Sequence, residues 1–222
     1  METYTCNRCH DMGWISEDLP ITDPNFGKVH RCPCKIDQDK TRWRKESGLT
    51  ESQLSTPLSF KKPGPGTSEM IKQGRTFAEN PIGTLFIHGS NGVGKTSMAY
   101  AMTSRMIDSG YRTVYTTGPN MFAWIRDGYG AQSQDETAMK RLDRLQSVRV
   151  LILDELDKVR PTDWVREIMS MFIDNRYRRR DELGTVVIAN NPDNLSPDVV
   201  SRLMEGAVVL NQDADYRQRR QG

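Results

Sequence analysis

One segment constrains the fold of this 222-residue chain more than any other, the run Gly89, Ser90, Asn91, Gly92, Val93, Gly94, Lys95 and Thr96. It matches the pattern G-x-x-x-x-G-K-[S/T] and lies between an apolar run, 84–88, and a predicted helix, 96–108. A glycine-rich turn in this position points backbone N–H groups at phosphates, and the helix N-terminus adds partial positive charge. We expect Lys95 to neutralise the β- and γ-phosphates of ATP and the Thr96 hydroxyl to bind Mg²⁺. All eight residues are therefore predicted to bind the nucleotide.

A second apolar run, 148–153, ends in two carboxylates, Asp154 and Glu155. In an open α/β sheet, ligands bind at the C-terminal ends of the strands, which is where these carboxylates stand. We expect Asp154 to join the Mg²⁺ shell, directly or through water, and Glu155 to orient and deprotonate the attacking water. Acidic residues also follow strands as helix caps, and we interpret Asp157 in that way. The two motifs together predict hydrolysis of ATP.

Predicted strands and helices alternate around these motifs. Besides 84–88 and 148–153, short apolar runs predict strands at 113–116 and 185–189. Apolar periodicity and capping residues predict helices at 69–79, 96–108, 119–127, 135–146 and 162–178. Such alternation favours a parallel sheet with helices on both faces. We therefore expect an α/β P-loop domain over 81–222.

All four cysteines of the chain lie near its start, as Cys6-x-x-Cys9 and Cys32-x-Cys34. No apolar run is long enough to span a membrane and the first residues lack a secretory pattern, so we expect a cytoplasmic chain with reduced thiols. Two short turns that each offer two thiolates suit tetrahedral Zn²⁺. This spacing predicts a structural zinc site in a small domain, 1–45. Reduced, partly buried cysteines without a metal are the alternative.

Charge gives little information for the whole chain, because 31 Lys and Arg against 29 Asp and Glu leave a net charge of +2. Positive charge is local instead, since 28–45 contains seven Lys or Arg and two Asp. This excess fits either a solvated helix face or a nucleic-acid or acidic partner. Proline and glycine in 61–68 are typical of a linker, and we expect 46–80 to be a linker with one short helix.

Several segments resemble one family. The cysteine-bearing segment 6–14, the strand before Asp154 and Glu155, and the segments 174–177, 185–191 and 201–203 are similar to AAA+ ATPases of the DnaC/DnaI helicase-loader group. The IstB transposition ATPases are related to that group. The resemblance implies an AAA+ base without a helical lid, because 81–222 is too short to add one. It also implies that a neighbouring subunit completes the ATP site, so that the chain works as a homo-oligomer.

The same resemblance implies roles for three residues after the last predicted strand. Asn191 matches the sensor 1 residue that touches the γ-phosphate or the lytic water, and its neighbour Asn190 could take that place instead. An Asn-Pro turn is the other interpretation of Asn191. Arg202 matches the arginine finger that reaches the ATP site of the adjacent subunit, with a surface ion pair as the alternative. Arg217 is similar to a terminal arginine that serves as a second sensor.

The function that the resemblance implies is ATP-dependent helicase loading. The zinc-binding domain would bind a replicative DNA helicase, and the ATPase base would help to place it on single-stranded DNA during replication initiation. An IstB-like ATPase that delivers duplex DNA to a transposase is one alternative, and a nucleotide-gated adaptor with negligible turnover is another. The run 176–180 fits either a solvated helix end or a single-strand-binding patch, with Tyr129, Arg141 and Arg144 as weaker DNA candidates.

Overall fold

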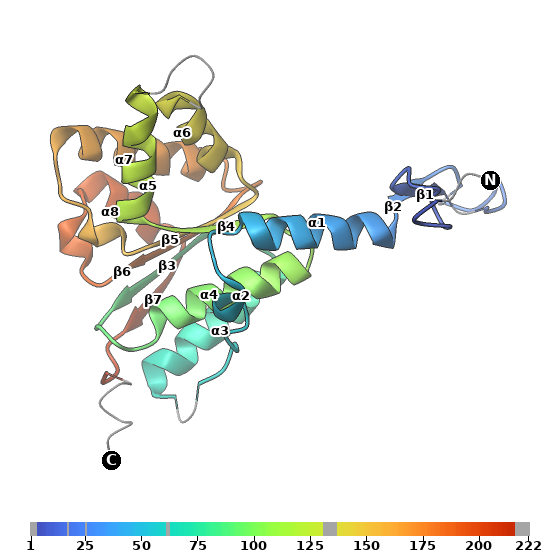
Figure 1. Ribbon diagram of the computed structural model, residues 1–222. Helices are drawn as coiled ribbons and strands as arrows, with labels where there is room; N and C mark the ends of the chain where they lie inside the picture. The colour runs from blue at the N-terminus through green and yellow to red at the C-terminus, as the bar shows by residue number, and fades with distance from the viewer. Residues whose placement is uncertain (1–3, 17, 25, 61–62, 131–136, 216–222) are drawn as a thin grey trace.

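Five parallel strands form one sheet, in the order β4-β5-β6-β3-β7 (Figure 1). The computed structural model describes residues 4–16, 18–24, 26–60, 63–130 and 137–215. The strands are β3 (Gly83–Gly89), β4 (Thr113–Thr117), β5 (Val150–Asp154), β6 (Gly184–Ala189) and β7 (Ala207–Asn211). The parallel α/β sheet confirms the predicted fold class. Strand β7 was not predicted, because it is a short edge strand in which Val208 and Leu210 are exposed.

The sheet separates two hydrophobic cores, because successive side chains of a strand point to opposite faces. In β3, Leu85 and Ile87 pack into one core, whereas Phe86 between them packs into the other. The same alternation holds in β5 and β6. All three strands are buried on both faces and therefore read as continuous apolar runs.

Helices cover both faces of the sheet (Figure 1). One face carries α3 (Pro65–Glu79) and α4 (Lys95–Asp108), with the short α2 (Glu51–Leu54) against α4. The other face carries α5 (Gly118–Asp127), α6 (Ala138–Ser147), α7 (Asp163–Arg178) and α8 (Pro197–Met204). Single 3₁₀ turns stand between these elements, namely η1 (Gly128–Gly130), η2 (Leu156–Lys158) and η3 (Pro192–Asn194). The predicted helices after the phosphate loop agree with the structure to within three residues at each end.

The segment expected to be a linker is more structured than predicted. Helix α3 begins at Pro65, inside the proline- and glycine-rich stretch, and its residues Met70 and Ala78 are fully buried. Proline suits the first turn of a helix because it has no N–H to leave unpaired. The Asp213 carboxylate, 146 residues away, accepts the N–H of Thr67 at 2.7 Å and so caps this helix from the far end of the chain. The boundaries 1–45, 46–80 and 81–222 stay a prediction.

Helix α1 (Pro33–Glu46) extends as an arm from the body that contains the five-stranded sheet, and the cysteine-bearing segment lies at its tip (Figure 1). That segment contains an antiparallel ribbon of β1 (Trp14–Ser16) and β2 (Val29–Arg31). The base of the arm is tied down by Arg44, which bonds Glu51 at 3.1 Å and Asp108 at 3.2 Å. No helix in the described part of the chain is both long and apolar enough to cross a membrane.

Candidate functional site

A cavity of about 700 Å³ opens at the carboxyl ends of β3, β5 and β6. It brings together most of the predicted site residues. Those that line it are Asn91, Gly92, Gly94, Lys95, Thr96, Asp154 and Glu155. The remaining predicted members of the phosphate loop do not line the cavity; they are Gly89, Ser90 and Val93. The strand-loop-helix order therefore produces the concave site that the sequence motif predicts.

Two glycines allow the loop to fold this tightly. Gly89 has φ +130°, and a Cβ there would lie 2.0 Å from the Asn211 carbonyl oxygen on the adjacent strand β7. Gly94 has φ +92°, and a Cβ there would lie 2.4 Å from the ring of Phe60. Both positions combine a backbone conformation that favours glycine with no room for a side chain. The backbone can therefore approach a ligand closely.

Lys95 is folded back onto the loop. Its Nζ donates to the carbonyl oxygens of Gly89 at 2.8 Å and Ser90 at 2.7 Å, and the residue is only 6% exposed. Burial lowers the pKa of Lys95 from its ordinary value, although Asp154 and Asp157 partly oppose this shift. The ammonium group is thus held at the loop, where phosphate oxygens can replace the two carbonyls as acceptors.

Thr96 and Asp154 meet at the first turn of α4. The Thr96 hydroxyl donates to Asp154 Oδ2 at 2.7 Å, and the Tyr115 hydroxyl donates to the same oxygen at 3.0 Å. Two neighbouring ligands of an octahedral Mg²⁺ lie about 3 Å apart, so the hydroxyl and the carboxylate fit that ion. Burial raises the pKa of Asp154, which is 1% exposed. A buried carboxylate of this kind gains most when a cation binds beside it.

Glu155 adopts a backbone conformation that is rare for a residue with a side chain. Its φ is +55° and its ψ is +37°, in the left-handed region. Such conformations cluster at functional sites, where the surrounding structure maintains the strain. The Glu155 carboxylate forms an ion pair with Lys158, which also lines the cavity. The residue predicted to be the general base therefore lies at the cavity and is paired with Lys158.

The structure distinguishes the two asparagines after β6. Asn190 lines the cavity, whereas Asn191 does not. The Asn191 side chain instead accepts the N–H of Asp193 at 3.0 Å, which is the Asn-Pro turn interpretation. The backbone N–H of Asn191 donates to Asp157 Oδ2 at 3.0 Å, and Asp157 is 8% exposed. Our interpretation of Asp157 as an ordinary helix cap was therefore wrong, because it joins η2 to the loop after β6.

Two predicted arginines are not part of this cavity. Arg202 lies on α8, where its guanidinium bonds Asp174 at 3.2 Å and stacks on the ring of Tyr177 at 5.0 Å. It does not reach the ATP site of its own chain, and a contact to a neighbouring subunit stays a proposal. Arg217 lies outside the described residues.

The sequence interpretation missed a whole cavity-lining segment, which contributes Thr56, Pro57, Ser59 and Phe60. They precede α3, in the segment expected to be a linker. The only signal was the aromatic residue Phe60 next to a stretch rich in proline and glycine. Tyr115 and Lys158 were also missed, since neither belongs to a motif that predicts a contact with Asp154 or Glu155.

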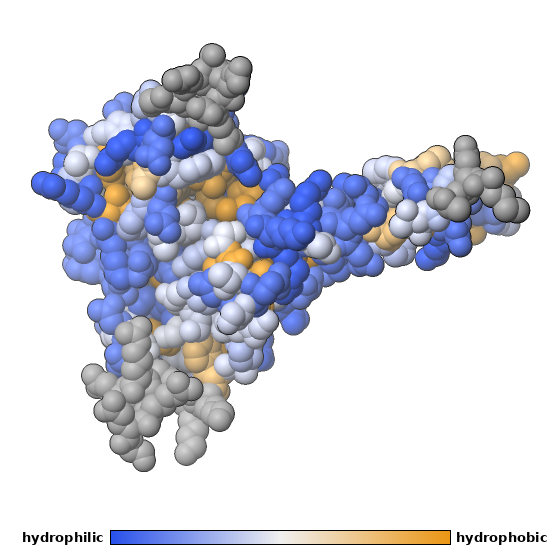
Figure 2. All heavy atoms as spheres, viewed as in Figure 1, coloured by the Kyte–Doolittle hydropathy of each residue, from blue (hydrophilic) through white to orange (hydrophobic). Residues whose placement is uncertain are grey.

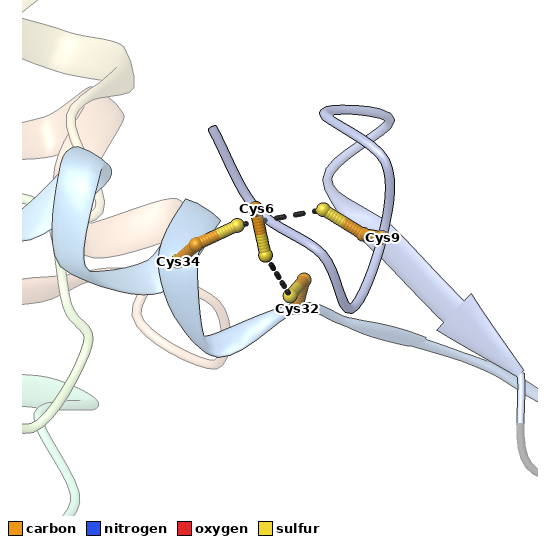
Figure 3. A group of neighbouring side chains, drawn as sticks. All are labelled: Cys6, Cys9, Cys32 and Cys34. Carbon is orange, nitrogen blue, oxygen red and sulfur yellow. Dashed lines mark hydrogen bonds between the residues drawn. The ribbon is translucent and has the colours of Figure 1, made fainter. Parts of the chain in front are cut away.

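The four cysteines converge at the tip of the arm (Figure 3). Their sulfur atoms all lie within 4.8 Å of one another, with Cys6 and Cys32 3.8 Å apart and Cys9 and Cys34 3.5 Å apart. A Zn²⁺ with four Zn–S bonds of about 2.3 Å holds its sulfurs about 3.8 Å apart. The thiol set therefore fits a closed tetrahedral zinc site.

Backbone groups prepare one of these thiols for a metal. Hydrogen bonds from the backbone of Cys9 and then Arg8 lower the pKa of Cys6 to about 6. Burial raises the pKa of Cys32, which is 1% exposed and caps the N-terminus of α1. Four thiolates this close repel one another strongly, so a cation is required for all of them to ionise.

Comparisons with known proteins identify the ATPase part of the chain. The model of the family described as "ATPase family associated with various cellular activities (AAA)" matches residues 85–209. This range contains Lys95, Asp154, Asn190 and Arg202, and it covers all five strands except the first two residues of β3 and the last two of β7.

Two relatives and one solved structure show what this chain is similar to. It is 27% identical over 113 residues to the replicative helicase loader DnaI of Bacillus subtilis, a match covering 50% of this chain and 34% of DnaI. It is 29% identical over 118 residues to an IS21 putative ATP-binding protein of Pseudomonas aeruginosa, covering 53% and 41%. The crystal structure of the DnaC helicase loader shares its fold, with TM-score 0.63 and 22% identity over 73% of this chain and 100% of that one. The chain thus spans less than half the length of these curated relatives.

Proposed function

Because the chain belongs to the ATPase family associated with various cellular activities (AAA), we propose that it binds ATP with Mg²⁺ and hydrolyses it to ADP and phosphate. The phosphate loop would bind the phosphates through backbone N–H groups, and Lys95 would exchange its two carbonyl acceptors for phosphate oxygens. Thr96 and Asp154 are the residues that would hold Mg²⁺, which supplies positive charge beside the phosphates. The ring of Phe60 lies at the edge of the cavity, where it can stack on the base.

Glu155 is the proposed general base. Its carboxylate pairs with Lys158, so it would have to turn away from that partner to reach the attacking water. We assign the sensor 1 role to Asn190, since it lines the cavity and Asn191 does not. Arg202 would complete the site of an adjacent subunit, which predicts a homo-oligomer and low activity for the isolated chain.

We further propose that this ATPase is a helicase loader. The observation that carries this proposal is the four-thiol cluster at the tip of α1. Helix α1 places this cysteine-bearing segment, here called the head, away from the ATPase body. Figure 2 shows apolar surface on that head. The exposed apolar residues there are Tyr4, Met12, Trp14, Ile21, Phe26 and Val29. A surface of this kind in a metal-stabilised head is typical of a protein-docking module, and we propose that a replicative DNA helicase binds it in the cytoplasm.

The similarity to the IS21 ATP-binding protein supports a second candidate, an ATPase that delivers duplex DNA to a transposase. The two functions differ in the form of DNA that they need. A competition between single-stranded and duplex DNA of equal length, with a non-hydrolysable ATP analogue present, separates them. Preference for the duplex would favour the transposition role.

The substitution Glu155→Gln tests the ATPase proposal. It removes the base and keeps the size of the side chain, so hydrolysis should fall by about 100-fold or more while ATP affinity stays close to that of the wild type. Glu167→Gln is the control, because Glu167 is exposed on α7 and lies outside the cavity. If hydrolysis is already slow in the wild type and Glu155→Gln leaves it unchanged, Glu155 has no catalytic role and the chain is better described as a nucleotide-gated adaptor.

Helicase docking can be tested separately. The double variant Cys32→Ser, Cys34→Ser should lose bound zinc and fail to capture the replicative helicase of the same organism, while binding ATP normally. Size analysis of the mixture with an ATP analogue measures the complex. Helicase capture that survives the loss of zinc would contradict the assignment of docking to the head.

A further inference from the structure

An aromatic cluster with an adjacent cation stands on the α5–α7 face, apart from both sites described above. The Trp164 indole N–H donates to the Tyr129 hydroxyl at 3.1 Å, and the two rings lie edge to face with centroids 6.0 Å apart. Trp164 also packs edge to face on Phe122, which is 2% exposed. The indole is thus anchored in the core and holds Tyr129 in place from one side. The Tyr129 ring is the outer member and is 63% exposed.

The cation of this cluster is Arg126. Its guanidinium lies over the Trp164 ring at 5.0 Å from the centroid, and the residue is exposed. Within the described parts of the chain, Arg126 forms no ion pair with a carboxylate. This differs from Arg166 on the same face, which pairs with Asp163 at 3.0 Å. The guanidinium of Arg126 is therefore accessible to an anionic ligand in the described structure, and its contact with the indole restricts its orientation.

We propose that Tyr129, Trp164 and Arg126 form a stacking site for single-stranded nucleic acid. A base stacks on the exposed face of Tyr129, and Arg126 binds a phosphate beside it. A pre-ordered ring beside a cation that has no carboxylate partner among the described residues suits an unstacked base better than it suits a duplex, whose bases are covered by their neighbours. An apolar protein partner would leave the Arg126 charge without a counter-charge. The inference rests on the proposed loader function, and it adds that the chain contacts bases as well as phosphates.

The cluster does not line the cavity, but helix α5, which holds part of it, packs against η2, the turn that follows Glu155. Gly118, the first residue of α5, packs closely on this turn, since a Cβ there would lie 2.8 Å from Val159 Cγ2 and 3.0 Å from Leu156 Cα. Trp164 follows Glu155 by nine residues, through η2 and the start of α7. Movement of Glu155 upon ATP binding can therefore reach both elements that hold the cluster. Binding to single-stranded DNA is expected to be stronger with an ATP analogue than without nucleotide.

The test compares two single strands of equal length in the presence of a non-hydrolysable ATP analogue. One is oligothymidine, and the other has the same phosphates but only abasic sites. Fluorescence anisotropy should show tighter binding of oligothymidine to the full chain. The substitution Tyr129→Ala should weaken oligothymidine binding by about 5- to 150-fold, as for loss of one base stack, and should leave the abasic strand unaffected. Arg126→Gln should weaken both strands and reduce the salt dependence of binding by about one phosphate contact.

The matched control is Trp14→Ala on the zinc head. Trp14 is 50% exposed and also lies beside an arginine, with Arg31 5.7 Å from its ring centroid. It should not change DNA affinity. Tyr129→Phe, which keeps the ring, should retain most of the affinity and shows that the effect is not loss of folding.

Equal affinity of the wild type for the two strands, or an unchanged affinity of Tyr129→Ala for oligothymidine, would overturn the stacking site. If ATP-sensitive helicase capture persists in that case, the loader function stands without it. Loss of helicase capture in Tyr129→Ala with normal DNA binding would make this surface a protein interface and also refute the proposal.

Discussion

Arg176 is the largest side chain that the fold buries completely, at 1% exposure. Its guanidinium bonds Thr185 Oγ1 at 2.9 Å and the carbonyl oxygens of Gly184 at 2.6 Å and Val148 at 3.1 Å, among others. Burial, and then the nearby Arg179, lowers its pKa to about 9. Arg176 is therefore not available to a DNA-binding patch formed by the run 176–180. A helix turns by about 100° per residue, so one member points into the core while its neighbours stay outside.

Replacing this arginine should destabilise the protein strongly. Arg176→Met leaves several buried carbonyl oxygens without donors, and we expect a loss of about 3–5 kcal/mol in the free energy of unfolding. Urea unfolding followed by circular dichroism measures it. Arg178→Met is the control, because the Arg178 side chain is 74% exposed and its ion pair with Asp174 should contribute less than about 1 kcal/mol. Equal losses for both variants would contradict the structural role of Arg176.

At the scale of single elements, η2 and η3 are joined by Asp157. One carboxylate oxygen accepts the Asn191 N–H, and the other is buried without a partner in the described residues. This contact fixes the loop that presents Asn190 to the cavity. Sequence alone could not reveal it, because the two elements are 34 residues apart and an acid after a strand has several common explanations.

Removing this contact should slow hydrolysis more than it weakens ATP binding. In Asp157→Ala the loop with Asn190 is freed, and we expect a fall of about 10-fold in kcat with little change in KM. Asp157→Asn keeps an acceptor oxygen and should restore most of the rate. Steady-state kinetics on the two variants decides; a rise in KM at constant kcat would show that Asp157 serves binding instead.

Zinc binding by the four cysteines should be coupled to helix α1, because Cys32 occupies the N-cap position of the helix and Cys34 lies in its first turn. Removing the metal with a chelator should loosen that turn, so we expect far-ultraviolet circular dichroism to lose helical signal while nucleotide affinity stays unchanged. Metal analysis should give about one zinc per chain before treatment. An unchanged spectrum after complete zinc removal would argue against this coupling.

The elements differ in how far the sequence predicts them. The strands β3, β5 and β6 were predictable, because they are apolar on both faces and bounded by glycine or charge. Strand β7 and the start of α3 were not, since each depends on distant partners: β7 pairs with β3, and α3 is capped by Asp213. The site divides in the same way. The phosphate loop and Asp154 belong to local motifs, whereas Phe60 and Tyr115 reach the site only through the tertiary fold.

At the scale of the whole molecule, no arginine of the described residues lines the cavity proposed to bind ATP, and Arg202 pairs with Asp174 instead. A mixing experiment tests whether a neighbouring subunit supplies it. Arg202→Ala and Glu155→Gln should each be almost inactive alone. Mixed, they should regain part of the wild-type rate, because some sites then combine an intact Glu155 with an intact Arg202.

The control for this experiment is Arg178→Ala, which should hydrolyse ATP at close to the wild-type rate on its own. Both ATPase rate and particle mass should be followed as the two variants are mixed. Mixtures that remain inactive, although they assemble, would show that Arg202 acts within its own chain or not at all.

Helix α1 can transmit a rotation of α4 to the cysteine-bearing segment at its tip. Helix α1 is about 21 Å long, and its base is fastened by Arg44 to Asp108 at the last turn of α4, whose first turn contains Lys95 and Thr96. A rotation of α4 by about 10° as the phosphates bind would swing the tip of such a helix by about 4 Å. The cysteine-bearing head stands at the far end of this helix, so a small rotation at the phosphate loop would become a larger displacement at the head, where we propose that a partner protein docks.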